Sequence, residues 1–223
     1  AKVRDILAAV RAEGDEALAR FARDFDKAPV AADAIAASTA DFDRAAWEAV
    51  PDSAYAVAWF GHSSLLVKLG GTTFLIDPVF GERASTFSFA GPKRFNYRQH
   101  MRVDLLPTVD VVLLSHDHYD HLDRETILLL KDKRFIAPLG VGAHLEAWGV
   151  AASAITEKDW WEGVQAGPVL LTLAPARHFS GRGLNNRAST LWGSWVMQAG
   201  GRKIFFGADS GYSPTFKEIG DRF

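Results

Sequence analysis

The sequence of 223 residues contains no cysteine. Disulfide bonds and thiolate metal sites are therefore excluded, so any metal centre must use imidazole nitrogen or oxygen ligands. No uninterrupted apolar run reaches the roughly 18 residues that a transmembrane helix needs. The first ten residues, AKVRDILAAV, lack the apolar stretch of a secretory signal. We therefore expect a cytoplasmic protein.

A strong charge of either sign is also missing. The formal net charge is -2, and the sequence shows no basic helix and no stacked-aromatic motif. These features argue against a nucleic-acid-binding protein. A GxGxxG dinucleotide fingerprint is absent as well, which argues against a dehydrogenase. Hydrophobic residues make up 48% of the chain, enough for one sizeable core with a small appendage.

The first part of the chain differs in composition from the remainder. No histidine precedes His62, and residues 1–54 carry seven Lys and Arg against eleven Asp and Glu, whereas the remainder carries eighteen against sixteen. Apolar residues at helical spacing predict a helix over residues 2–25 with a break at Gly14, and a second one from Ser38 or Thr39 to before Pro51. The sequence therefore predicts a helical N-terminal segment, 1–54, and a separate domain, 55–223.

From Tyr55 onward the pattern is that of short strands. Residues 57–60, 64–69 and 72–76 favour strands, and Gly70-Gly71 is a two-residue hairpin signal. Further strands are predicted at 135–138, 169–174, 191–198 and 203–206, and helices after Asp123, at 141–148 and after Pro214. The long irregular stretch 79–106 is typical of a functional loop. Together these elements predict an α/β fold with packed sheets and outer helices.

The most informative stretch is residues 111–123, which read VVLLSHDHYDHLD. Its apolar start predicts a buried strand that delivers polar side chains at its tip. Four potential metal ligands follow within six residues: His116, His118, Asp120 and His121. A loop that leaves a strand end can turn such side chains toward one point, and imidazole and carboxylate suit an open catalytic Zn²⁺ site. The alternative is a solvated polar loop.

Three other polar residues also follow predicted strands. His178 and Asp209, taken singly, would be a surface histidine and a turn aspartate. Asp77 ends the strand before Pro78, and it is either a turn residue or a partner that orients a metal-binding histidine. Only in combination with the 116–121 cluster do these residues indicate a metal centre.

Several stretches between Trp59 and Pro214, in order, resemble one family: WFGHSSLLVKLGG, LIDPVFGERAS, GPKRF, LLSHDHYDHLD, ARHFSGRG and FFGADSGYSP. They are similar to the N-acyl-phosphatidylethanolamine-hydrolysing phospholipase D family of metallo-β-lactamase-fold hydrolases. The resemblance implies an αββα sandwich in residues 55–223. It also implies hydrolysis of a phosphodiester in N-acyl-phosphatidylethanolamine-like phospholipids through a metal-bound hydroxide.

The same resemblance implies a two-zinc site. It assigns one Zn²⁺ to His116, His118 and His178, the second to Asp120 and His121, and a bridging role to Asp209, with Asp120, His116 and His118 as the catalytic residues. The family supplies a further histidine from a later strand, beyond the last residue of this sequence. His62, His100 and His144 do not replace it by motif. We therefore expect a C-terminally incomplete domain with a weak second metal site and doubtful activity.

Residues around the site suggest how a substrate could bind. Asp77, His62, Lys93 and Arg94 are candidates for second-shell or substrate contacts. The loop 91–102 is basic and carries interleaved aromatic residues, so it would suit an anionic head group or a membrane surface, or it is simply solvated. The expected partners are a small molecule or phospholipid and a peripheral membrane surface, without nucleic acid; the oligomeric state is left open.

Other interpretations compete for both parts of the chain. Residues 2–52, with the run VRDILAAVRAEGDEALARFARDFD, resemble the N-terminal region of histidinol dehydrogenase, although none of that family's zinc or catalytic positions is present. A plain amphipathic helical extension explains the same pattern. The main domain could instead hydrolyse another ester, a lactone or a sugar phosphate, or be an inactive fused fragment that keeps part of the metal site.

Overall fold

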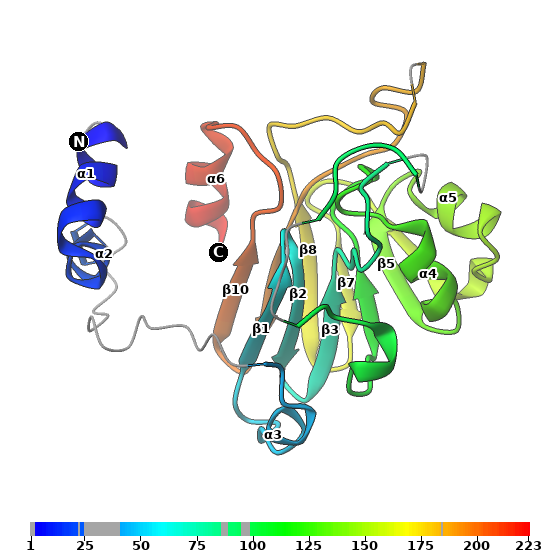
Figure 1. Cartoon of the computed structure of the whole chain (residues 1–223), viewed down its shortest axis with the longest axis horizontal. Helices are drawn as coiled ribbons and strands as arrows, with labels where there is room; N and C mark the ends of the chain where they lie inside the picture. The colour runs from blue at the N-terminus through cyan, green and yellow to red at the C-terminus, as the bar shows by residue number, and fades with distance from the viewer. Residues whose placement is uncertain (1–2, 22, 25–40, 86–88, 95–98, 184) are drawn as a thin grey trace. The chain divides into compact units, whose positions relative to one another are not determined.

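The computed structural model describes residues 3–21, 23–24, 41–85, 89–94, 99–183 and 185–223 (Figure 1). The chain forms two compact units, Ala1–Asp41 and Phe42–Phe223. The first unit contains helices α1 (Val3–Glu13) and α2 (Asp15–Phe21). Gly14 separates them with a φ of 58°, a left-handed conformation that ends a helix. The predicted break at Gly14 is confirmed.

The short helix α3 (Arg44–Glu48) belongs to the second unit. The Asp43 side chain caps it by accepting a hydrogen bond from the Ala46 N–H at 3.1 Å. Trp47 is buried in the core of the second unit, and Phe42 packs against that core. The division by contacts therefore falls after Asp41 and not at the predicted residue 54, because these two aromatic side chains join the larger core. The predicted helix start at residues 38–39 lies outside the described residues.

Two sheets form the centre of the second unit. The larger sheet has the order β1 (Ala56–Gly61), β2 (Ser64–Leu69), β3 (Thr72–Ile76), β4 (Val111–Leu113), β5 (Arg134–Pro138) and β6 (Ile155–Lys158). Its first three strands are antiparallel, and β3 to β6 are parallel. The smaller, antiparallel sheet has the order β10 (Arg202–Phe206), β9 (Ser194–Ala199), β8 (Val169–Ala174) and β7 (Gly163–Ala166). Strands β6 and β7 were not predicted, because their sequences ITEK and GVQA are short and weakly apolar.

The hairpin between β2 and β3 follows directly from its turn residues. Gly70 and Gly71 have φ angles of 55° and 75°. Two consecutive positive φ angles define the tight turn whose twist matches that of paired strands, and glycine adopts them without a Cβ clash. The predicted hairpin is confirmed.

Strand alternation gives the larger sheet two apolar faces. On β4, Val111 and Leu113 face the smaller sheet, where they pack with Leu171 and Trp195 in the core between the sheets. Val112 faces the opposite way, into a second core. A strand buried on both faces reads as a continuous apolar run, which explains the sequence VVLL.

Helices cover the outer faces of both sheets. Helices α4 (Arg124–Leu130) and α5 (Gly142–Ala147) pack on the larger sheet through Ile127 and Leu145. Helix α6 (Thr215–Arg222) packs through Ile219 against Val196 of the smaller sheet. Figure 1 shows α4 and α5 on one side of the sheets and α6 on the other. The predicted helix–sheet–sheet–helix order of an α/β fold is confirmed.

Polar loops follow β1, β3, β4, β8 and β10, and their side chains meet at one rim of the sandwich. This rim is where the sequence analysis expected a metal centre. Within the described part of the chain, no helix is long and apolar enough to cross a membrane.

Candidate metal centre

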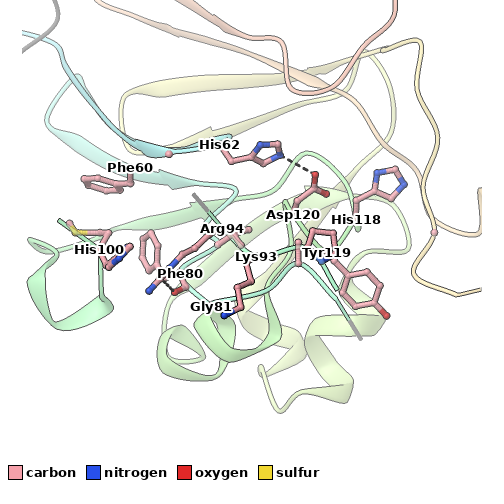
Figure 2. A pocket seen from close by; sticks show the side chains of 16 residues that line it. Phe60, His62, Phe80, Gly81, Lys93, Arg94, His100, His118, Tyr119 and Asp120 are labelled. Carbon is pink, nitrogen blue, oxygen red and sulfur yellow. Dashed lines mark hydrogen bonds and ion pairs between the residues drawn. The ribbon is translucent and has the colours of Figure 1, made fainter. Parts of the chain in front are cut away.

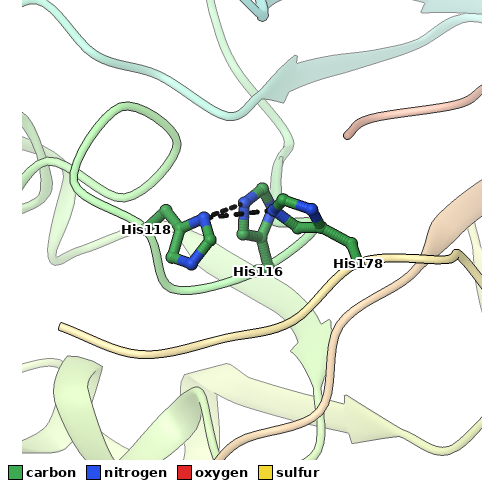
Figure 3. A group of neighbouring side chains, drawn as sticks. All are labelled: His116, His118 and His178. Atoms are coloured by element: carbon green, nitrogen blue, oxygen red, sulfur yellow. Dashed lines mark hydrogen bonds between the residues drawn. The ribbon is translucent and has the colours of Figure 1, made fainter. Parts of the chain in front are cut away.

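Three histidines from two distant loops converge at this rim. His116 and His118 follow β4, and His178 follows β8. The Nδ1 atom of His118 lies 3.0 Å from Nε2 of His116 and 3.1 Å from Nε2 of His178 (Figure 3). Nitrogens bound at about 2.0–2.1 Å to a tetrahedral ion would lie about 3.3 Å apart. This histidine group, His116, His118 and His178, therefore has the spacing of three ligands around one ion.

A second group with mixed ligands lies beside the first. One ligand atom from each of His62, Asp120 and His121 falls within 4.8 Å of the others. The Nε2 atom of His62 lies 3.0 Å from Oδ2 of Asp120, the contact drawn as a dashed line in Figure 2. The rings of His116 and His121 are 4.1 Å apart between centroids, so this mixed group adjoins the histidine group.

Asp209, in the loop after β10, lies between the two groups. Its Oδ1 atom is 3.5 Å from Nε2 of His121, and its Oδ2 atom is 3.8 Å from Nε2 of His178. One carboxylate thus faces a nitrogen of each group. The bridging role that the resemblance implies for Asp209 stays a prediction, and this position is compatible with it.

Asp77 is the buried support of both groups. Its Oδ1 atom accepts a hydrogen bond from the Ser115 N–H at 2.8 Å. Its Oδ2 atom accepts from the Ser115 hydroxyl at 2.5 Å and from Nδ1–H of His121 at 2.8 Å. The Asp77 backbone has a φ of 41°, an unfavourable left-handed conformation that the surrounding contacts hold in place. Both carboxylate oxygens of Asp77 already accept hydrogen bonds. The role of Asp77 as a partner that orients a metal-binding histidine stays a prediction, and these contacts are compatible with it.

Asp77 also fixes the tautomer of His116 through Ser115. Because the Ser115 hydroxyl donates to Asp77, it accepts from Nδ1–H of His116, 2.9 Å away. Nε2 of His116 is then left with its lone pair directed at the histidine group, an assignment that follows from the hydrogen-bond network. A carboxylate behind a histidine in this way is a common arrangement around protein-bound metal ions.

A buried orphan atom indicates that a cation fits the mixed group. Nε2 of His121 is buried and has no hydrogen-bond partner among the described residues. Its Nδ1 atom is committed to Asp77, and Asp209 at 3.5 Å is too distant for a good hydrogen bond. An unsatisfied buried nitrogen is costly, and a divalent ion with nitrogen and oxygen ligands would satisfy it.

The protonation of the two groups differs. Burial and the neighbouring imidazoles of His121 and His118 lower the pKa of His116 to about 2. Burial also lowers the pKa of His118 and of His178, which favours the neutral form of the histidine group. Burial alone would lower the pKa of His121, but the carboxylates of Asp209 and Asp77 outweigh it and raise that pKa to about 10. The mixed group therefore carries a proton that a metal ion would have to displace.

A cavity of about 460 Å³ opens beside the mixed group (Figure 2). Its walls are mainly apolar and include Phe60, Phe80 and Met101, while Asp120 and His62 are among its polar lining residues. This volume is typical of a small-molecule site. The cavity thus joins an apolar chamber to potential metal ligands.

The predicted cationic residues also line this cavity, but each has a partner. Lys93 forms an ion pair with Glu82 at 2.9 Å, and Nη1 of Arg94 donates to the Phe80 carbonyl oxygen at 2.6 Å. Residues 95–98 of the predicted basic loop lie outside the described residues. The described part of this loop therefore places two cationic side chains at the cavity. Because each already has a partner, an anion would have to share or replace these contacts.

Asp117 and Arg182, which the sequence patterns did not single out, connect the loops of the metal centre. Asp117 is buried, accepts a hydrogen bond from the Gly181 N–H at 2.6 Å and lies 3.2 Å from Nε2 of His144. Nη1 of Arg182 donates to the carbonyl oxygens of Asp117 at 2.8 Å and Leu122 at 2.7 Å. These contacts tie the loop that carries His178 to the loop after β4. Asp117 stands inside the 116–121 motif, but spacing alone does not distinguish a tether from a ligand.

Comparison with known families agrees with this architecture. The family described as "Beta-lactamase superfamily domain" matches residues 72–223. This chain belongs to the beta-lactamase superfamily. Its paired sheets with outer helices are the metallo-β-lactamase fold, as the resemblance implied. The His and Asp groups at the rim are the potential metal-binding groups of this superfamily member.

Its curated relatives include bacterial and animal proteins. The uncharacterized protein Rv0906 of Mycobacterium tuberculosis is 44% identical over 171 residues, which are 75% of this chain and 45% of the relative. The N-acyl-phosphatidylethanolamine-hydrolyzing phospholipase D 1 of Caenorhabditis elegans is 34% identical over 183 residues, 77% of this chain and 51% of the relative. The chain thus spans about half the length of these relatives. The resemblance of residues 2–52 to histidinol dehydrogenase is not supported.

Solved structures share the fold of this superfamily member. Igni18, a metallo hydrolase from Ignicoccus hospitalis, aligns with a TM-score of 0.55 and 18% identity over 75% of this chain and 66% of its own. CmlA, a diiron beta-hydroxylase from Streptomyces venezuelae, aligns with a TM-score of 0.53 and 23% identity over 74% of this chain and 32% of its own. Because CmlA is a diiron protein, the fold alone does not select zinc.

Proposed function

We propose that this chain provides the metal centre of a hydrolase that cleaves a phosphodiester bond in N-acyl-phosphatidylethanolamine-like phospholipids. The main observation behind this proposal is that two adjoining groups of His and Asp side chains lie at a largely apolar cavity. The similarity to the Caenorhabditis elegans phospholipase D supports the choice of phosphodiesterase chemistry.

In this proposal two Zn²⁺ ions are held at the rim. His116, His118 and His178 would hold one ion, Asp120 and His121 would hold the other, and Asp209 would contribute a carboxylate that faces both groups. Imidazole and carboxylate donors suit Zn²⁺ in an open catalytic site, and the absence of cysteine argues against a closed structural site. Bound divalent metals supply Lewis acidity, polarising a phosphoryl oxygen and lowering the pKa of water from near 16 to about 7.

The side chains of the chain itself would position the reactants. Asp120 lines the cavity and lies 3.0 Å from His62, so it is placed to orient a nucleophilic water as well as to bind metal. Asp77 and Ser115 keep Nε2 of His116 free for a cation by occupying its Nδ1 atom. The neutral state of the histidine group, favoured by burial, allows it to bind a cation without first losing protons.

The cavity matches an amphiphilic substrate. Phe60, Phe80 and Met101 offer an apolar surface to an acyl chain, and Lys93 with Arg94 adds positive charge near the phosphate. Such a substrate resides in a lipid layer, so we also propose that the protein contacts a membrane surface peripherally. Each cation near an anionic surface contributes about 1 kcal/mol to such contact.

A substrate panel tests this function. Zinc-loaded protein is offered N-acyl-phosphatidylethanolamine in mixed micelles, and separately a carboxylic ester, a lactone and a sugar phosphate. We expect hydrolysis of the phospholipid alone, with one water consumed and N-acylethanolamine and phosphatidic acid formed, and no hydrolysis of the other three substrates. We expect Asp120→Ala to lower the rate at least 100-fold, in line with the loss of a positioned acid–base group. Asp110→Asn is the control, because Asp110 accepts the Thr73 N–H at 2.8 Å just before β4, at the strand end opposite the metal centre.

Other results of the panel would contradict the proposal in distinct ways. Hydrolysis of the lactone or sugar phosphate alone would keep the hydrolase and reject the phospholipid. Full activity of Asp120→Ala would reject the role of Asp120. One bound metal ion per chain, or none, would favour the inactive fragment considered above.

A further inference from the structure

The turn between β1 and β2 places an additional nitrogen ligand at the mixed group. We infer that His62 is a metal ligand that completes a second cation site together with Asp120 and His121. The inference rests on the metal centre of the proposed function, and it adds a ligand that the motif itself does not supply. The sequence motif alone does not identify His62 as a ligand, because His62 lies far from the 116–121 cluster along the chain.

The distances support a shared ion. Nε2 of His62 is 3.0 Å from Oδ2 of Asp120, and the three residues each offer one ligand atom within 4.8 Å of the others. The rings of His62 and His121 lie 5.2 Å apart between centroids and nearly perpendicular, so one ion can face an edge of each. Two imidazoles and one carboxylate form a three-ligand set that open zinc sites use.

An independent observation points to a missing cation at this place. Nε2 of His121 belongs to a fully buried side chain and has no hydrogen-bond partner in the part of the chain that is described. Its other ring nitrogen donates to Asp77, so in the neutral imidazole, the form that binds a metal ion, Nε2 carries the lone pair. If His62 only oriented Asp120 by a hydrogen bond, this lone pair would stay unsatisfied. A cation held by all three side chains satisfies it.

The neighbouring group of Asp77, His116 and His121 does not offer an equivalent site. Its ligand atoms are also close together. However, both oxygens of Asp77 already accept hydrogen bonds, from the Ser115 N–H, the Ser115 hydroxyl and His121. The mixed group is therefore the better second site.

The backbone of the turn holds His62 in this position. His62 has a φ of 46°, a left-handed conformation in which glycine and asparagine are preferred. The indole Nε1–H of Trp59 donates to the His62 carbonyl oxygen at 2.7 Å and fixes the turn. Figure 2 shows the His62 ring directed at Asp120. Histidine is among the residues enriched in this conformation, so the turn holds the imidazole at the mixed group without an unusual backbone.

Metal stoichiometry tests the inference without relying on activity. The wild-type chain, His62→Asn, His62→Ala and His100→Ala are saturated with Zn²⁺, freed of excess metal and measured by elemental analysis and titration calorimetry. We expect two ions per chain in the wild type and one in both His62 variants, with the second binding constant reduced about 100-fold or more. His100→Ala is the matched control, since His100 lines the same cavity but belongs to none of the three ligand groups found among the described residues.

Two further measurements make the result decisive. Asparagine tolerates the left-handed turn, so His62→Asn separates the loss of a ligand from a misfolded hairpin, and circular dichroism verifies folding of every variant. Titration with Co²⁺ followed by visible absorption reports the second site directly. The absorption band that appears when the second equivalent of Co²⁺ binds to the wild type should be absent in His62→Asn.

The outcomes separate this inference from the proposed function. Two tightly bound ions in folded His62→Asn and His62→Ala would overturn the ligand role of His62 and leave the proposed function intact. A single ion in the wild type would also overturn it, while the histidine group would stand. No bound metal in the wild type would overturn both.

Discussion

The histidine group and the mixed group differ in how the fold prepares them. In the histidine group, Nδ1 of His118 lies about 3 Å from Nε2 of both His116 and His178, and burial lowers the pKa of His116 and so favours its neutral form. In the mixed group, His62 and Asp120 have side chains that are 48% and 43% exposed, and only His121 is fully buried. The comparison indicates one preformed site and one site open to the cavity, where a substrate and an ion could meet.

The two groups nevertheless share their support. Asp77 orients His121 directly and His116 through Ser115, and Asp209 faces both His121 and His178. A change in either carboxylate should therefore affect both groups, whereas a change in one ligand should affect mainly its own group. The following predictions use this difference.

The largest effect is expected from His116→Ala. Removing one of three nitrogens should lower the affinity of the histidine group for Zn²⁺ by more than about 100-fold, beyond the usual effect of losing a second-shell partner. Titration calorimetry measures the affinity, with His100→Ala as the control. An unchanged first binding constant would show that His116 is not a ligand.

A smaller loss, shared by both groups, is expected from Asp77→Asn. The amide cannot accept from all three donors that the carboxylate serves, so His116 and His121 lose their fixed tautomers. We expect a 10- to 100-fold decrease in affinity at each site. Asparagine tolerates the φ of 41°, and Asp110→Asn controls for the loss of a charge elsewhere. A loss confined to one site would contradict the shared support.

The pH dependence should separate the groups further. The pKa of His121 is raised to about 10, so a metal ion entering the mixed group must displace a proton, whereas the pKa of His116 is lowered to about 2 and no proton leaves it. Below pH 10, affinity at the mixed group should therefore rise about tenfold per pH unit, while affinity at the histidine group stays flat near neutral pH. Calorimetry in buffers of different ionisation enthalpy counts the protons released. Equal proton release at both sites would contradict the assignment.

The smallest effect on metal binding is expected from Asp123→Ala. Asp123 caps α4 and also accepts the Gly81 N–H at 2.9 Å. Losing the cap and leaving these donors unpaired should lower the free energy of unfolding by about 2 kcal/mol. Thermal or urea unfolding measures this loss. Metal stoichiometry should not change, and a lost ion would mean that α4 helps to shape the site.

Local patterns were enough to predict several elements. The apolar run of β4 followed by His116, the paired glycines before β3 and the cap at Asp123 each depend on neighbouring residues, so the sequence indicates them directly. The α/β fold class followed from the same signals. Two features were not predicted: the short, weakly patterned strands β6 and β7, and the packing of α3 into the core of the second unit. Contacts with residues distant in the sequence stabilise both.

The sequence by itself determined which side chains could bind a cation and that most of them follow strand ends. Only the tertiary structure decided which of them meet. His62 joins Asp120 through the turn between β1 and β2, and Asp77 reaches Ser115 and His121 because β3 pairs with β4 in a fixed register. The physical reason is that sheet register and left-handed turns place atoms within ångströms of one another across long stretches of chain, and no local pattern encodes that distance.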